Sequence, residues 1–272
     1  MESIVPTVYG SQIYNCSILD LPFYYQPQST INEALSINSG AINYQQPYTP
    51  TLKYIAIGNG GHKIVNGNNG IGIPDPIQHL TTDANLYNIL PFVIVPQTND
   101  LTAEEQTNYA LKTSRIINNV SYFLYYLKVI DTSNLSLVTT INSTVNNETV
   151  AQPFVPGIAN IYPTPPNLSN NGNYQLVPNT VKNSINVNFL LNSTDIANFL
   201  NVVEIVPEAY NIGIISEIAL CTGVWDSLLN DVIGVQPAIF IDTFFPLAFN
   251  MNQLNYQFSI GNTQALYQLT NG

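Results

Sequence analysis

Short apolar runs separated by proline and glycine dominate the chain, and this pattern predicts a protein built mainly of β-strands. The alternation of Ile185, Val187, Phe189 and Leu191 is typical of a half-buried strand. The Asn118-Asn119 pair inside a long apolar run predicts a hairpin turn or a bulge. We therefore expect a mainly β (α+β) fold with a β-sandwich-like core. The expected strands lie at 53–57, 86–95, 114–130, 135–141, 185–191, 212–221, 235–247 and 254–269.

Two or three short helices are expected between these strands. Thr102 followed by Glu105 forms a capping box, which predicts a helix that continues to about Leu111. A second helix is expected from the Ser193-Thr194-Asp195 segment to about Val203, because its apolar residues recur at helical spacing. A third short helix is possible near residues 31–35.

Residues 1–50 are rich in Pro, Tyr and Gln and predict an extended N-terminal arm. Each proline in the Leu21–Pro27 segment holds the residue before it in extended geometry. Two uses of such an arm remain open, namely packing onto a neighbouring protein and covering the core of its own domain. The sequence divides into this arm (1–50), a β-rich core domain (51–230) and C-terminal strands or an extension (231–272), with long Pro/Asn-rich loops at 58–76 and 151–179.

Few charged residues occur, which limits the possible partners. Only 8% of the residues are charged, with 6 basic against 17 acidic side chains and a net charge of −11. Nucleic acids and anionic membrane surfaces need a basic face, so neither is expected as a partner. Dispersed surface charge normally keeps a free protein soluble. Its scarcity is typical of a subunit enclosed by neighbours, although codon bias in an AT-rich genome gives a similar composition.

The sequence shows no secretory signal and no apolar stretch long enough to cross a membrane. We therefore expect synthesis in the host cytoplasm, where Cys16 and Cys221 remain reduced. Cys221 lies inside an apolar strand, so its thiol is expected to be buried and inert.

The strongest metal-site candidate combines the only two histidines with two nearby acids: His62, Asp75, His79 and Asp83. Loop spacing of this kind is unspecific, and polar loop residues more often bond to their own backbone. We therefore expect no metal and no cofactor. The Gly58-Asn59-Gly60-Gly61 segment lacks the spacing of a phosphate-binding loop, so we interpret it as a turn that needs glycine.

Glu217 interrupts the apolar Ile214–Leu220 run. A buried carboxylate needs a partner, for which Arg115 or Lys53 are candidates. A glycoside hydrolase would instead need two carboxylates that face each other, and the sequence does not show whether Glu217, Asp226, Asp231 and Asp242 converge. We expect a structural role for Glu217 and no enzymatic activity.

Two segments resemble the N-terminal domain of phage tail-collar fibre proteins. The first runs from Ile55 to Gly61 and continues through the Ile73–Pro76 loop to Leu86-Tyr87; the second is Ser216-Glu217-Ile218-Ala219-Leu220. The resemblance covers roughly residues 53–224 and implies a rigid β scaffold for attachment. It also implies structural roles for Gly58, Gly60, Gly61 and Glu217.

Together these observations predict a structural subunit of a tailed-phage virion, placed in the tail, the baseplate or a fibre attachment. It would act by permanent packing against other virion proteins, as a homo-oligomer in a symmetric assembly. Two alternatives stay open. One is a receptor- or glycan-binding module of a tail fibre, which the 17 Tyr and 11 Phe would suit although Trp225 is the only tryptophan. The other is a virion-associated hydrolase.

Overall fold

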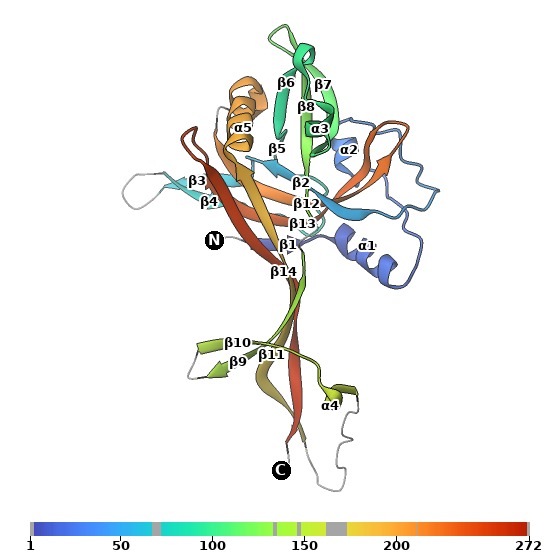
Figure 1. The fold of residues 1–272 in the computed structure, drawn as a ribbon, viewed down its shortest axis with the longest axis vertical. Coiled ribbons are helices and arrows are strands. Elements are labelled where there is room, and N and C mark those ends of the chain that lie inside the picture. The colour runs from blue at the N-terminus through green and yellow to red at the C-terminus, as the bar shows by residue number, and fades with distance from the viewer. Residues whose placement is uncertain are drawn as a thin grey trace. The chain divides into compact units, whose positions relative to one another are not determined.

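The computed structural model describes residues 3–66, 72–132, 135–145, 148–161, 173–210 and 212–270. The chain forms two compact units, which we call unit 1 (Met1–Asp131 and Leu191–Leu254) and unit 2 (Thr132–Leu190 and Asn255–Gly272). Strands predominate in both, so the predicted mainly β class is confirmed (Figure 1). The observed units differ from the predicted three-part division, because each unit is made of two segments that are separate in the sequence.

Unit 1 is built around an antiparallel sheet of eight strands. Two of the eight strands lie off the main path: the short β5 (Ile89–Leu90) pairs with β2, and β7 (Tyr109–Ile117) pairs with β8. Along the main path the order is β1 (Ser3–Pro6), β13 (Asp231–Pro246), β12 (Ile214–Asp226), β2 (Thr51–Gly58), β8 (Val120–Val129) and β6 (Val93–Pro96).

The centre of this sheet is apolar on both faces. Strand β12 is buried from Ile215 to Gly223, and β13 from Asp231 to Thr243. Such continuous burial explains why both segments are largely apolar, with few interruptions such as Glu217 and Asp242. The predicted hairpin at Asn118-Asn119 is confirmed, since both residues adopt left-handed backbone (φ 49° and 63°) between β7 and β8.

The helices confirm part of the predictions. Helix α2 (Ile31–Ala34) lies where a short helix was expected. Helix α3 (Ala103–Gln106) has the predicted Thr102–Glu105 capping box but ends early, because Tyr109 already begins β7. Helix α5 (Ser193–Ile205) buries the predicted apolar face, although its N-cap is Asn192. Short 3₁₀ turns occupy Gln97–Asn99 and Pro207–Ala209.

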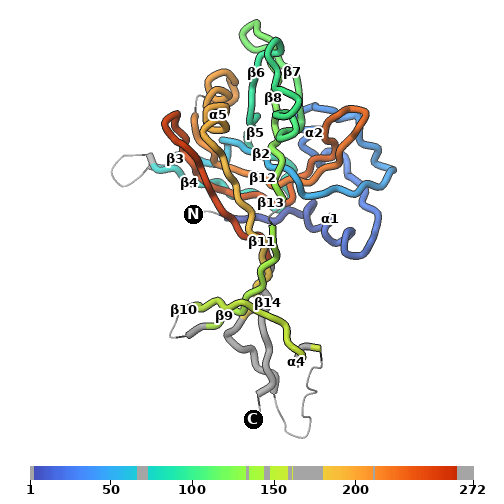
Figure 2. The backbone as a smooth tube through the Cα atoms, in the orientation of Figure 1, coloured from blue at the N-terminus to red at the C-terminus, as the bar shows by residue number. Residues whose placement is uncertain are grey.

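The prediction of an extended N-terminal arm was wrong for helix α1 (Val8–Ile18), which lies between Pro6 and Pro22 in a proline-free segment capped by Thr7. Figure 2 traces the segment from β1 through α1 and α2, both of which contact β13. Of the two uses left open, the structure shows the second, because the segment covers the core of its own unit. Four of its buried residues pack into one cluster with Ile233, namely Ile13, Phe23, Tyr25 and Ile42.

The predicted loop at 58–76 was also wrong in part. It contains a two-stranded sheet of β3 (His62–Asn66) and β4 (Gly72–Pro76). Pro74 and Pro76 fit there because each strand has a free edge that needs no N–H donor.

Unit 2 contains a four-stranded antiparallel sheet in the order β10 (Glu148–Pro153), β9 (Leu137–Val145), β11 (Asn173–Asn192) and β14 (Gln253–Thr270). Helix α4 (Ile158–Ile161) precedes residues 162–172, which fall in the predicted 151–179 loop but lie outside the described residues. In the described ranges, no helix has both the length and the hydropathy required to span a bilayer.

Asn32 should be a major determinant of stability, because its fully buried amide joins α2 to β13. The side chain donates to Ile37 O (3.2 Å) and Val232 O (3.1 Å) and accepts from the N–H of Val235 (2.8 Å). We expect Asn32→Ala to lower the free energy of unfolding by about 2–4 kcal/mol, measured by urea denaturation. Asn15→Ala, at an exposed position of α1, is the control and should change it by less than about 0.5 kcal/mol. Equal effects would contradict this assignment.

Candidate functional site

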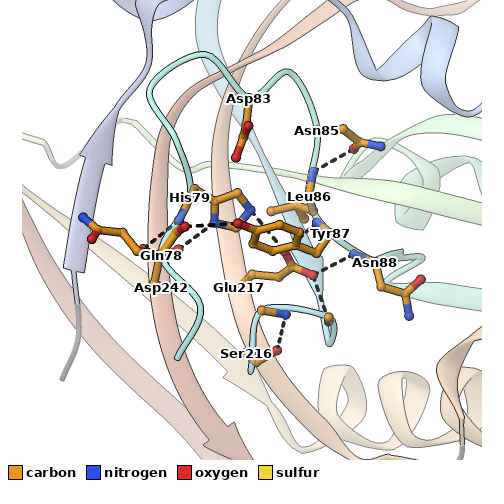
Figure 3. A network of polar contacts seen from close by, with 12 residues as sticks. Gln78, His79, Asp83, Asn85, Leu86, Tyr87, Asn88, Ser216, Glu217 and Asp242 are labelled. Carbon is orange, nitrogen blue, oxygen red and sulfur yellow. Dashed lines mark hydrogen bonds and ion pairs between the residues drawn. The ribbon is translucent and has the colours of Figure 1, made fainter. Parts of the chain in front are cut away.

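The most concentrated polar chemistry of unit 1 lies at the centre of its apolar sheet. Glu217 of β12 and Asp242 of β13 are direct partners in the strand register. His79, from the segment between β4 and β5, lies against both carboxylates (Figure 3). We call His79, Glu217 and Asp242 the buried triad.

The triad is closely packed and closed to solvent. His79 Nδ1 lies 2.6 Å from Asp242 Oδ1, and Nε2 lies 3.2 Å from Glu217 Oε2. The second contact has the distance of an ion pair but lacks the alignment of a hydrogen bond. The three residues are 2%, 0% and 1% exposed. The imidazole stacks on Phe240 at 4.1 Å between ring centroids, and Tyr87 lies 4.5 Å away.

Backbone groups occupy the remaining acceptor positions of Glu217. Its Oε1 accepts from the N–H groups of Gly60 (2.9 Å) and Asn88 (2.9 Å), and its Oε2 accepts from Tyr87 N–H (2.8 Å). Asp242 also accepts a bond from the Ser3 hydroxyl. These donors offset the cost of burying a carboxylate in an apolar sheet.

The environment favours the charged form of the histidine. Burial alone would lower the pKa of His79, but its hydrogen bond to Asp242 and the close carboxyl groups of Glu217 and Asp242 outweigh burial and raise the pKa to about 9. At neutral pH the triad therefore holds one imidazolium between two carboxylates.

The glycine turn of residues 58–61 packs directly on this triad. A Cβ at Gly58 would lie 2.5 Å from both Asn88 O and Glu217 Oε1, and one at Gly61 would lie 2.9 Å from Ser216 O. Gly60 is similarly close to Asn88. The structure thus brings together Gly58, Gly60, Gly61 and Glu217, the four residues for which a structural role was predicted.

The geometry suits a clamp better than a catalytic centre. A substrate has no route to side chains that are almost completely buried, and the acceptors of Glu217 are already occupied. The same contacts fix residues 79–88 onto the sheet at both ends of that segment. Tyr9 adds a bond to Thr82 O, and the N–H of Val8 donates to Thr81 O.

The predicted metal candidates do not converge. Asp75 pairs with Lys63 at 3.3 Å, and Asp83 accepts from the N–H of Leu80. His79 belongs to the triad, and His62 lies against Phe244. Within the described ranges, no three His, Cys, Asp or Glu residues are arranged to hold a metal ion.

Both suggested partners of Glu217 were wrong. Arg115 pairs with Glu208 instead, while Lys53 is exposed and Glu217 is fully buried. Sequence reasoning missed His79 as the partner because the two residues are 138 positions apart. A signal was nevertheless present: Glu217 and Asp242 each interrupt an apolar strand, and a buried carboxylate needs a polar or charged partner.

The other carboxylates considered for hydrolysis also have structural contacts. Asp231 accepts from the N–H groups of Leu111 (2.7 Å), Lys112 (3.0 Å) and Val232 (2.8 Å), and it thereby holds Leu111 at φ 57°. Burial raises the pKa of Asp231 despite these bonds. Cys221 is fully buried, which raises the pKa of its thiol, as expected of an inert cysteine.

Stability should depend on pH through His79. The pKa is about 9 in the folded state and about 6.5 in the unfolded chain, so the folded state binds the extra proton between these values. The stabilisation is complete below about pH 6.5 and is lost as the pH rises through 9. We expect the free energy of unfolding to fall by roughly 3 kcal/mol across that window, measured by urea denaturation at several pH values.

The histidine variants separate this effect from other titrations. His79→Gln should be less stable at pH 6 and should flatten the dependence between pH 6.5 and 9. His62→Gln is the control and should keep the full slope. A slope that survives in His79→Gln would mean that another group is responsible.

Glu217→Gln should destabilise the fold, because the amide nitrogen of Gln would face a backbone N–H that now donates to the carboxylate, and His79 would lose one counter-charge. We expect a loss of about 3 kcal/mol, read from the unfolding midpoint. Glu204→Gln, on the exposed side of α5, should be nearly neutral. Equal stability of the two variants would show that Glu217 is not part of a clamp.

Comparison with known proteins places the chain in a family but gives no activity. No curated protein and no solved structure matches it. A family model described as a family of unknown function, DUF7208, matches residues 1–272. Because that match covers the whole sequence, the chain belongs to the DUF7208 family.

Proposed function

We propose that the chain is a structural subunit of a tailed-phage virion, in the tail, the baseplate or a fibre attachment, and that it acts by permanent packing against neighbouring proteins. The observation that carries this proposal is an uncovered apolar sheet face in unit 2. The tail-collar resemblance supplies the virion part of the proposal.

The register of the unit 2 sheet defines this face. Residues paired across antiparallel strands point to the same side. Leu137 pairs with Ile185, and Ile141 pairs with Val181. Val150 pairs with Ser143, which lies on the same side of β9 as Leu137 because an even number of positions separates them. The aliphatic residues on this side, which we call the aliphatic face, are Leu137, Ile141, Val150, Val181 and Ile185; the same side also carries Thr139, Ser143, Asn183, Gln152 and Glu148. None of the five aliphatic residues is buried, and Leu137 is 67% exposed.

Unit 2 also lacks the charges that keep such a face soluble. Of the 23 charged residues of the chain, only Glu148 and Lys182 lie in it. Additional aliphatic side chains outside the sheet are also exposed, among them Val155 (81% exposed), Ile158 (76%) and Ile161 (70%). An apolar surface of this kind, nearly free of charge, is typical of an interface that stays covered.

Unit 1 supports the attachment part of the proposal. The two segments of the tail-collar resemblance are far apart in sequence, yet they lie on neighbouring strands: Gly58 of β2 pairs with Glu217 of β12, and Ala56 pairs with Ala219. The buried triad makes this region rigid, as a scaffold requires. Its closure argues against the hydrolase alternative.

Leu137→Lys should block incorporation into the particle. Burial of an uncompensated ammonium in an apolar interface costs several kcal/mol, so we expect the amount in purified virions to fall by about tenfold or more. Val138→Lys is the matched control, because its side chain points to the opposite face of the same strand and is 39% exposed. The measurement is quantitative mass spectrometry of virions from phage that carry each variant.

Both variants should retain the unfolding temperature of the parent, which separates an assembly defect from a folding defect. Equal incorporation of the two variants would contradict the role of the aliphatic face. Absence of the unmodified chain from purified virions would overturn the proposed function itself.

A further inference from the structure

A second site lies in unit 1 at the turn between β12 and β13, and it differs from the triad in being open. It is a cleft of about 460 Å³, a volume in the range of small-molecule sites. Trp225, the only tryptophan of the chain, lines the cleft and is 52% exposed. A large aromatic surface exposed inside a concave site is a binding feature rather than part of the core.

The aromatic surface is held in place by its hairpin. Trp225 lies opposite Val232 in the β12–β13 register. Asp226 closes the turn by accepting the N–H groups of Leu228 (2.8 Å) and Leu229 (3.2 Å). The backbone that carries the indole is therefore ordered before a ligand stacks on it, which lowers the entropic cost of association.

Polar groups in the same cleft are also fixed in advance. Gln106 lines the cleft, and its side-chain amide is held by bonds from its nitrogen to Leu101 O (2.7 Å) and Asp100 (3.2 Å). The Lys112 ammonium is held 2.5 Å from Asp100 and 3.9 Å from the Phe123 ring centroid, with further N–H groups to donate. An acceptor and a donor beside an aromatic face match a ring that carries hydroxyl groups on its edge and C–H groups on its faces.

The charge of the cleft selects the ligand class. The positive charge of Lys112 is already balanced by Asp100, and Asp231 adds a negative charge to the lining. Asn38 and Asn230 contribute neutral amides. An anionic ligand would meet an excess of negative charge, whereas a neutral one would not. We propose that this cleft binds a neutral oligosaccharide through stacking on Trp225, a function that goes beyond the proposed packing role.

The single tryptophan makes the test direct, because all indole fluorescence comes from the cleft. The purified full chain is titrated with maltotriose, cellotriose, chitotriose and lactose, and with sialyllactose as the anionic probe. We expect a saturable blue shift of the emission with at least one neutral sugar, since stacking removes water from the indole. Sialyllactose should bind more weakly than lactose.

Calorimetry on variants identifies the contact. Trp225→Ala should weaken binding by about tenfold or more. Leu228→Ala is the control, because Leu228 is 94% exposed on the same turn and does not line the cleft.

Three results would overturn the proposal: no saturable response to any neutral sugar, binding that Trp225→Ala leaves unchanged, or preference for sialyllactose. A tryptophan that responds only on assembly with another protein would assign the cleft to a protein interface instead. None of these results would bear on the aliphatic face of unit 2, so the proposed function is tested separately.

Discussion

The packing of unit 1 depends on an ion pair that is buried inside an apolar sheet. Two carboxylates on neighbouring central strands would repel each other across a medium that screens charge poorly. His79 resolves this repulsion, since its proton stays bound at neutral pH and its ring packs between Phe240 and Tyr87. Because a histidine from a distant loop supplies the counter-charge, that loop must close over the sheet before the sheet is stable. Loop and sheet therefore depend on one another, and the glycine turn at Gly58–Gly61 leaves the space in which they meet.

The sequence predicted local features well and long-range partners poorly. Strands such as β2 and β8, the Asn118-Asn119 turn and the Thr102 capping box follow from neighbouring residues, whose physics is visible in a short window. Helix α1 was missed because the prolines around it dominated the interpretation of the arm. The pairing of His79 with Glu217 was missed for a different reason. A buried carboxylate shows that a polar or charged partner is needed, but the identity of that partner depends on the topology, which brings residues 138 positions apart into contact.

The same contrast applies to the second site. The sequence shows that Trp225 is the only tryptophan, yet only the fold places it beside Gln106 and Lys112 in one cleft. Conversely, the scarcity of charge was evident from composition, but its uneven distribution was not. The unit boundaries assign nearly all charged residues to unit 1, and the amphipathic character of the unit 2 sheet emerges only from the strand register.

The two units differ in how many charged residues they contain and in what those residues contact. In unit 1 many ionisable groups are bonded to partners within the unit, as Asp231, Asp100 and Arg115 illustrate, and they order loops and turns. Charges used in this way add less to solubility than free surface charges do. Unit 2 has only two charged residues, and the five members of its aliphatic face are exposed or half-buried. The proposed packing against other proteins would remove this face from water, whereas the contacts described for unit 1 lie within that unit. With few charges in the chain, unit 1 uses its ionisable groups in internal contacts such as the buried triad, and unit 2 is left with an exposed aliphatic face.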